Sequence, residues 1–129
     1  MPVASALTIM VVDDQRSMRS VVKESLRTIG CHRLTECENG EDALKALALR
    51  PVHLIISDLN MPKMDGLGLL RAVRADPALQ QTGFIMLTSR GEVDLVKQAM
   101  QLGVNNYLTK PFTTATLKKK IESVFGPLT

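Results

Sequence analysis

The sequence has few of the residues that build thiolate, redox or disulfide sites. Its 129 residues contain two cysteines, Cys31 and Cys37, and two histidines, His32 and His53. The cysteines have no CxxC spacing and lie in no Cys or His cluster, so we expect reduced thiols that are packed or exposed. We expect both histidines to be structural or exposed as well.

Long hydrophobic runs and a strong charge imbalance are also lacking. No apolar stretch approaches the roughly 20 residues that cross a bilayer, and no basic leader precedes the first apolar run. We therefore expect no membrane insertion and a cytoplasmic location. The net charge of +3 is too small to argue for nucleic-acid binding. The basic run at 118–120 is expected to be a solvated face near the end of a helix.

The composition that remains is typical of a globular protein, with 45% hydrophobic and 22% charged residues. A chain of this length is expected to form one domain around one core. We predict a single domain over residues 1–129, with residues 1–6 and 126–129 as short tails.

Short apolar and β-branched runs alternate with helical patterns along the chain. Helical spacing follows each run, and turn or capping residues mark the helix ends. Gly30 and Gly103 are expected to end the first and fourth helices, and Asn39 is expected to cap the second. Ser89 and Glu92 stand in the S-x-x-E relation of a capping box that would open the fourth helix. The strands are expected at residues 7–12, 32–37, 52–57, 84–88 and 105–109.

This alternation predicts an α/β fold in which a five-stranded, parallel, doubly wound sheet is covered by five helices. The first, third and fourth strand candidates are almost continuously apolar, as central strands buried on both faces should be. The second is more polar and suits an edge. In such a sheet, ligands bind beyond the carboxyl ends of the strands.

Polar side chains with related chemistry follow four of the five expected strands. Because parallel strands end at one edge of the sheet, we expect these side chains to lie together although they are distant in sequence. They are Asp13 and Asp14 after the first strand, Asp58 after the third, Thr88 at the end of the fourth and Lys110 after the fifth.

Three neighbouring carboxylates repel one another unless a cation or protons neutralise them. Hard oxygen ligands without Cys or His suit Mg²⁺, or Mn²⁺, better than zinc. A carboxylate can also attack phosphorus to form an aspartyl phosphate, and Asp58 on the central strand is the candidate nucleophile. The Lys110 ammonium and the Thr88 hydroxyl would then contact phosphoryl oxygens.

Four segments together resemble the receiver domains of two-component response regulators, and among them the chemotaxis, CheY-like type. They are VVDD at 11–14, SDLNMPKMDG at 57–66, Thr88 within MLTSR, and YLTKPF at 107–112. The resemblance covers nearly the whole chain. It implies a flavodoxin-like sheet with strand order 2-1-3-4-5.

The resemblance also implies phosphotransfer to Asp58 from a phosphohistidine on a histidine kinase. It implies that Asp14 and Asp58 bind Mg²⁺ directly, that the backbone carbonyl of Asn60 is a further ligand, and that Asp13 acts through a metal-bound water. It implies a cis Lys110–Pro111 bond.

The same resemblance implies a switch in which Thr88 moves toward the phosphoryl group and Tyr107 turns inward. The surface of the fourth helix, fifth strand and fifth helix would then bind an output protein such as a flagellar motor switch component. A dedicated phosphatase is a further possible partner. The fifth helix is expected to end near Phe125, so we expect a stand-alone receiver that catalyses only its own phosphorylation and dephosphorylation.

Three positions differ from the chemotaxis pattern: Leu59 replaces a frequent tryptophan, Ser89 a small alanine, and Arg90 a residue that is commonly acidic in motor-binding members. Ser89 and Arg90 would flank the phosphoryl group, so they bear on its lifetime. Alternatives within this family are a phosphate sink and a phosphorelay outside chemotaxis.

Two other classes remain as alternatives. A Mg²⁺-dependent phosphohydrolase with an aspartate nucleophile usually has a second acid two residues further on, where this chain has Asn60. A flavin or nucleotide binder would need a Gly-rich or Ser/Thr-rich loop after the first strand. Asp13 and Asp14, which repel phosphate without a metal, occupy that loop instead.

Overall fold

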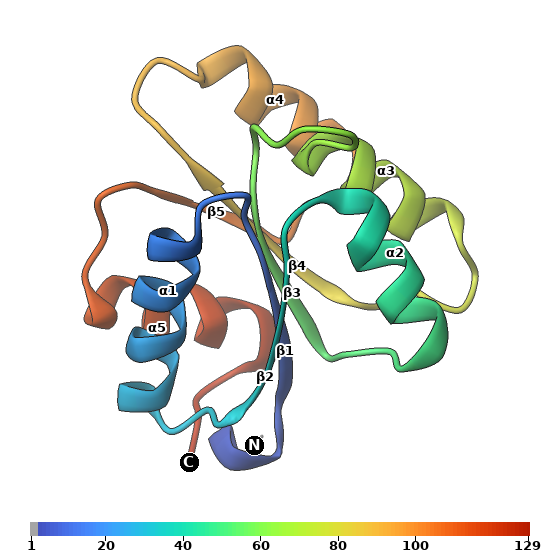
Figure 1. Ribbon diagram of the computed structural model, residues 1–129. Helices are drawn as coiled ribbons and strands as arrows, with labels where there is room; N and C mark the ends of the chain where they lie inside the picture. Colours follow the sequence, from blue (N-terminus) through green and yellow to red (C-terminus); the bar gives the residue numbers. More distant parts are fainter. Residues whose placement is uncertain (1–2) are drawn as a thin grey trace.

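The computed structural model describes residues 3–129 and contains one parallel sheet between two layers of helices (Figure 1). The strand order is β2-β1-β3-β4-β5, and every neighbouring pair is parallel. This confirms the predicted fold class and order. The strands are β1 (Thr8–Val12), β2 (Arg33–Cys37), β3 (Leu54–Asp58), β4 (Gly83–Thr88) and β5 (Asn106–Thr109).

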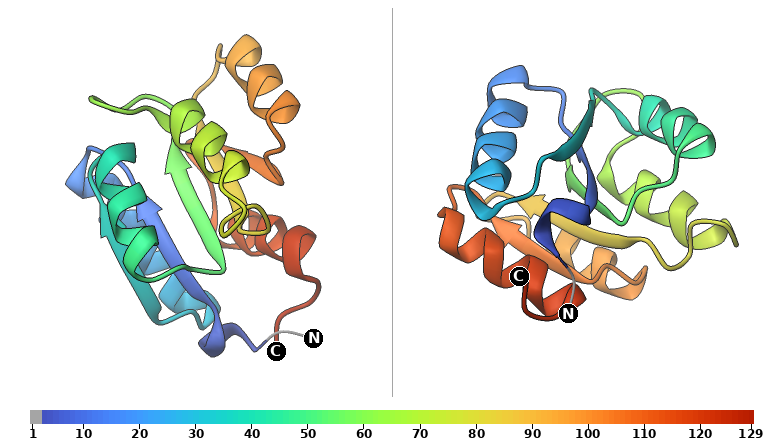
Figure 2. Two further views of the ribbon diagram at one scale, coloured as in Figure 1. Left: turned by 90° about the vertical axis from the view of Figure 1, so that its right-hand side faces the viewer. Right: turned by 90° about the horizontal axis from the view of Figure 1, so that it is seen from below.

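The helices divide between the two faces of the sheet. One face carries the first and fifth helices, and the other carries the remaining three (Figures 1 and 2). Their bounds are α1 (Arg16–Ile29), α2 (Gly40–Leu49), α3 (Gly66–Ala75), α4 (Val93–Gln101) and α5 (Thr114–Phe125).

Alternation along the central strands produces two hydrophobic clusters. In β1, Ile9 and Val11 face the cluster beneath α1 and α5, whereas Met10 and Val12 face the cluster beneath α2, α3 and α4. β3 and β4 are buried along their whole length, and β2 is mostly exposed, as expected for an edge strand. A sheet packed on both faces holds its strand ends in fixed positions.

Most of the predicted helix ends are confirmed. The Asn39 side chain accepts a hydrogen bond from the backbone N–H of Asp42. Gly30 takes a left-handed conformation with φ of 110° after α1, and Gly103 does so with φ of 92° after α4.

The peptide bond between Lys110 and Pro111, which follows β5, is cis, as the resemblance implied.

The start of the fourth helix differs from the prediction. α4 begins at Val93, so Ser89 is not its N-cap, and the residue at that position, Glu92, makes no capping bond with its side chain. Only one half of the capping box forms, because a Glu92 carboxylate oxygen accepts from the Ser89 backbone N–H. The other Glu92 carboxylate oxygen accepts from the side-chain amide of Asn60, in the loop after β3.

The two terminal segments lie together below the sheet (Figure 2). Residues 1 and 2 of the expected N-terminal tail lie outside the described residues. Ala4–Ala6 form a short 3₁₀ helix, and the Ala4 backbone N–H donates to the carbonyl oxygen of Thr129 at 3.1 Å. Ala4 is buried against the cluster beneath α1 and α5.

A glycine allows the loop after β3 to fold back closely on that strand. A side chain at Gly66 would overlap the backbone carbonyl oxygen of Asp58 and approach Met86 Sδ to 2.8 Å. The Gly66 N–H donates to the carbonyl of Leu59 at 2.9 Å. The first residue of α3 is therefore packed directly against the backbone of Asp58.

Candidate functional site

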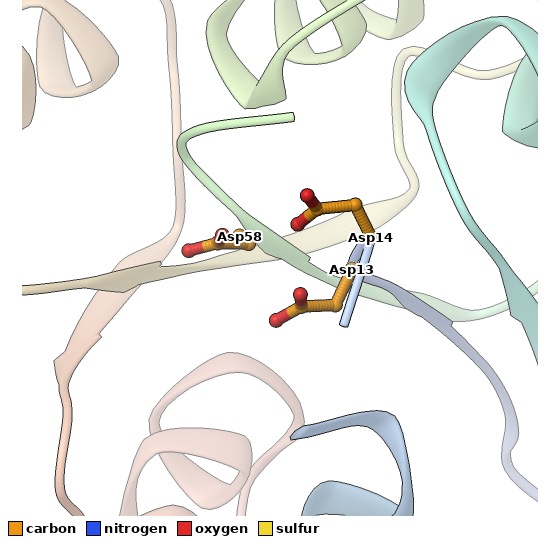
Figure 3. A group of neighbouring side chains, drawn as sticks. All are labelled: Asp13, Asp14 and Asp58. Atoms are coloured by element: carbon orange, nitrogen blue, oxygen red, sulfur yellow. The ribbon is translucent and has the colours of Figure 1, made fainter. Parts of the chain in front are cut away.

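Three carboxylates meet where β1 and β3 end. One oxygen from each of Asp13, Asp14 and Asp58 lies within 4.8 Å of the other two. The side chains point to the same side of the sheet edge (Figure 3). The pairing of Val12 with Ser57 brings the two strand ends side by side. The predicted convergence of these three acids is confirmed.

The environments of the three acids differ. Asp13 is fully buried, Asp58 is 8% exposed, and Asp14 faces solvent. Burial raises the pKa of Asp13 from 3.8 to about 6, and the charges of Asp58 and Asp14 act in the same direction. A hydrogen bond from the Gln15 N–H to Asp13 Oδ1, at 2.9 Å, and the charge of Lys110 oppose this rise.

The arrangement fits a hard divalent cation. Within residues 3–129, Asp13 Oδ2 is the one buried side-chain oxygen or nitrogen without a hydrogen-bond partner. An ionised oxygen in that position is strongly disfavoured unless a cation compensates it. The donor set consists of oxygens alone, as Mg²⁺ and Mn²⁺ prefer. Asp13, Asp14 and Asp58 could therefore hold such an ion, directly or through water.

Lys110 provides a positive charge beside these acids. Its Nζ lies 3.0 Å from Asp58 Oδ1 and 3.9 Å from Asp13 Oδ2. Its backbone N–H donates to the carbonyl of Thr88 at 2.7 Å, which fixes the residue to the end of β4. The Thr88 side chain is buried, and its Oγ1 lies 3.5 Å from Oγ1 of Thr109 on the next strand. Both predicted residues thus lie at the strand ends, with Lys110 in direct contact with Asp58.

Asn60 and Tyr107 lie at the margin of this cluster. Asn60 is exposed, and its side-chain amide donates to a Glu92 carboxylate oxygen at 2.6 Å. Tyr107 on β5 is 39% exposed, with Lys120 Nζ 5.3 Å from the centre of its ring. The Tyr107 side chain therefore lies at the surface rather than inside the molecule.

Sequence reasoning missed a basic residue that supports the acidic pair. Arg19 is only 7% exposed, and its Nη1 donates to the backbone carbonyl of Asp13 at 2.8 Å. Its Nε donates to Glu36 Oε1 at 2.7 Å, so it also connects α1 to β2. Arg19 shares a helix face with Val22 and Leu26. A charged residue at core-facing helical spacing was the signal that could have revealed it.

A family model matches most of the chain. A model for the response regulator receiver domain matches residues 9–122, from β1 into α5. The chain belongs to the response regulator receiver family. The resemblance seen in the sequence motifs is thereby confirmed, and the match includes all seven predicted site residues of this receiver.

Curated relatives align with this receiver over nearly their whole length. A Rhizobium etli relative that bears the name chemotaxis protein CheY is 44% identical over 128 residues, which cover 99% of each chain. The chemotaxis protein CheY of Pseudomonas aeruginosa is 41% identical over 119 residues, which cover 92% of this receiver and 96% of the relative. This receiver is therefore a CheY-like response regulator of the two-component type.

Solved structures have the same fold. A response regulator from Chloroflexus aurantiacus matches with a TM-score of 0.88 at 26% identity and covers 98% of this receiver and 100% of its own chain. The chemotaxis response regulator CheY4 of Vibrio cholerae matches with a TM-score of 0.83 at 30% identity, over 92% of this receiver and 98% of its own chain. Over residues 3–129, none of the helices is both long and apolar enough to span a bilayer.

Proposed function

We propose that this receiver is phosphorylated on Asp58 by transfer from a phosphohistidine of a histidine kinase, in a Mg²⁺-dependent reaction. An Asp58 carboxylate oxygen attacks phosphorus, the P–N bond to the histidine breaks, and the imidazole leaves with the electron pair of that bond. The proposal rests on one observation above all. The Lys110 ammonium lies 3.0 Å from Asp58 in a cluster with two further carboxylates.

Each side chain has a distinct role in this proposal. Lys110 would neutralise a phosphoryl oxygen as charge moves from the donor to Asp58, and Thr88 would donate its hydroxyl hydrogen to another oxygen. Asp13, Asp14, Asp58 and the Asn60 carbonyl would hold Mg²⁺, which when bound neutralises negative charge on the phosphoryl group. Arg19 would position Asp13 through its backbone carbonyl.

The output step would use the surface of α4, β5 and α5. A cavity of about 330 Å³ is lined by Thr88, Val96 and Tyr107 among others, so the tyrosine lies beside a space into which its ring could turn. Movement of Thr88 toward the phosphoryl group would enlarge that space. The likeness to chemotaxis proteins named CheY supports chemotaxis as the pathway. A cytoplasmic location and a flagellar motor switch protein as the partner are part of the proposal.

An enzymatic function on external substrates finds less support. Asn60 occupies the position where an aspartate-based phosphohydrolase would need an acid to protonate the leaving group. The Asn60 amide donates a hydrogen bond to Glu92. An amide group is not acidic, so it has no proton to give to a leaving group. We therefore propose that the protein catalyses only its own phosphorylation and dephosphorylation.

Labelling with acetyl phosphate tests the role of Asp58 directly. With Mg²⁺ present, the intact mass should increase by one phosphoryl group, and peptide mapping should locate that group on Asp58. The Asp58→Asn variant should take up no label at this position, because an amide is not a nucleophile toward phosphorus. Equal labelling of the variant and the parent protein would show that another residue accepts the phosphoryl group.

A further inference from the structure

The carboxylate of Glu92 connects the two loops that flank the phosphoacceptor. Its Oε2 accepts a hydrogen bond from the Asn60 side-chain amide at 2.6 Å, and its Oε1 accepts one from the backbone N–H of Ser89. Asn60 belongs to the loop after β3, and Ser89 to the loop after β4. Glu92 itself belongs to the loop after β4, so its Oε1 closes a turn within that loop and its Oε2 joins that loop to the loop after β3.

Both donors closely follow residues of the candidate site along the chain. Asn60 follows Asp58 by two residues, and Ser89 directly follows Thr88. Since Asp58 pairs with Leu87 across the sheet, the two loops leave neighbouring strands at the same level. The Glu92 carboxylate therefore lies in a loop at the same end of the sheet as the cluster of Asp13, Asp14 and Asp58.

Glu92 also connects this edge to the fourth helix. It is the residue directly before Val93, where α4 begins, and its backbone carbonyl accepts from the Val96 N–H at 3.0 Å. Its side chain does not cap the helix, although this position normally favours such a bond. The Glu92 carboxylate thus belongs to a residue whose backbone is part of the start of α4, next to Val93, which is 61% exposed.

We propose that Glu92 is a positioning residue that latches the unphosphorylated state and competes with the phosphoryl group. This inference rests on the function proposed above. A phosphoryl group on Asp58 carries negative charge that repels the Glu92 carboxylate, and its oxygens can accept hydrogen bonds from the same donors. Phosphorylation would release the Glu92 carboxylate from Asn60 and Ser89. The first turn of α4, at the edge of the output surface, is then free to move.

Beryllofluoride, which mimics a phosphoryl group on aspartate, provides a test in the full chain. Glu92→Gln keeps the size of the side chain but replaces one acceptor oxygen with a donor and removes the charge. We expect this variant to bind beryllofluoride about three- to fivefold more tightly, as loss of a charged hydrogen bond at a solvated site would allow. Asp94→Asn is the matched control, because Asp94 is an exposed acid in the first turn of α4. It should change the affinity less than about twofold.

Amide NMR of the protein without metal and beryllofluoride tests the latch itself. Glu92→Gln should shift the Asn60 side-chain resonances and increase hydrogen exchange at the Ser89 amide, whereas Asp94→Asn should change neither. Unchanged signals in Glu92→Gln, or equal affinity gains in both variants, would overturn the latch. If the parent protein bound no beryllofluoride, the proposed function would fail instead, and the NMR comparison would still decide whether Glu92 holds the loops.

Discussion

Asp13 is fully buried at the end of β1, and burial raises its pKa to about 6. Because this pKa lies above the ordinary value of 3.8, the folded chain binds more protons than the unfolded chain between about pH 4 and 6. Ionisation of Asp13 therefore makes an unfavourable contribution to stability that grows as the pH rises through this window. A divalent cation would offset this contribution by favouring the charged form.

Replacement of Asp13 by Asn should stabilise the metal-free protein. At about pH 7.5 we expect the free energy of unfolding of Asp13→Asn to exceed that of the parent by about 1–3 kcal/mol, since the amide has no charge to desolvate. The difference should fall below about pH 6 and become small near pH 4. Urea denaturation in EDTA at several pH values would measure it.

Added Mg²⁺ supplies the internal control for this experiment. The cation should stabilise the parent protein, whose carboxylate it needs, and stabilise Asp13→Asn less. A parent protein that becomes more stable relative to Asp13→Asn as the pH rises without metal would contradict the raised pKa.

At the scale of elements, Arg74 on α3 joins segments that precede β4 and β5. Its Nε donates to the Gly103 carbonyl at 2.9 Å, and its Nη1 donates to the carbonyls of Gln80 and Thr82 at 3.0 and 2.7 Å. Its Nη2 donates to Asn105 Oδ1 at 2.9 Å. One guanidinium thus fixes the loop before β4 and the loop between α4 and β5 to the same helix.

Truncation of this side chain should weaken the packing of α3 against both loops. We expect Arg74→Ala to lower the free energy of unfolding by about 2–4 kcal/mol, because four acceptors lose a charged donor. Arg74→Lys should recover only part of this loss, since one ammonium group cannot reach all four acceptors. Urea denaturation monitored by circular dichroism would give the values.

Arg71 provides the control for the loss of positive charge. It is exposed on the same helix, so Arg71→Ala should change stability by less than about 0.5 kcal/mol. Equal effects of the two alanine variants would show that the Arg74 hydrogen bonds contribute little.

At the scale of the whole molecule, two loops join the candidate site to the proposed output surface of α4, β5 and α5. The loop after β4 contains Ser89 and leads into α4, while the residues after β5 contain Lys110 and lead into α5. A change at Asp58 can therefore reach α4 and α5 through one connection each. This arrangement supports the proposal that phosphorylation of Asp58 acts by changing how α4, β5 and α5 bind a partner protein.

Affinity capture would separate a motor-binding regulator from a phosphate sink. If the output is motor binding, beryllofluoride with Mg²⁺ should increase the amount of a flagellar motor switch protein that this receiver retains, as mass spectrometry can identify. The Asp58→Asn variant should retain the same amount with and without beryllofluoride. A parent protein that binds beryllofluoride but captures no additional partner would favour the phosphate sink.

The strand ends could be predicted from sequence because their local patterns are strong. The apolar run before Asp58 specifies a buried strand, and parallel strands necessarily end at a common edge. Asp13, Asp14 and Lys110 were assigned to that edge by the same reasoning, and the structure places them there. The start of α4 was predicted wrongly, because the capping-box spacing does not reveal that Glu92 binds another loop.

Sequence alone determined the alternation of strands and helices, the edge strand, the receiver family and the acids that would meet. These features follow from residue periodicity and from motifs that are contiguous in the chain. Only the tertiary structure showed that Asp13 is fully buried with one oxygen that has no hydrogen-bond partner, that Arg19 supports its backbone, and that Glu92 joins the loops after β3 and β4. The burial of Asp13 and the bond between Asn60 and Glu92 depend on segments that are distant in sequence, and their geometry is set when the helices pack onto the sheet.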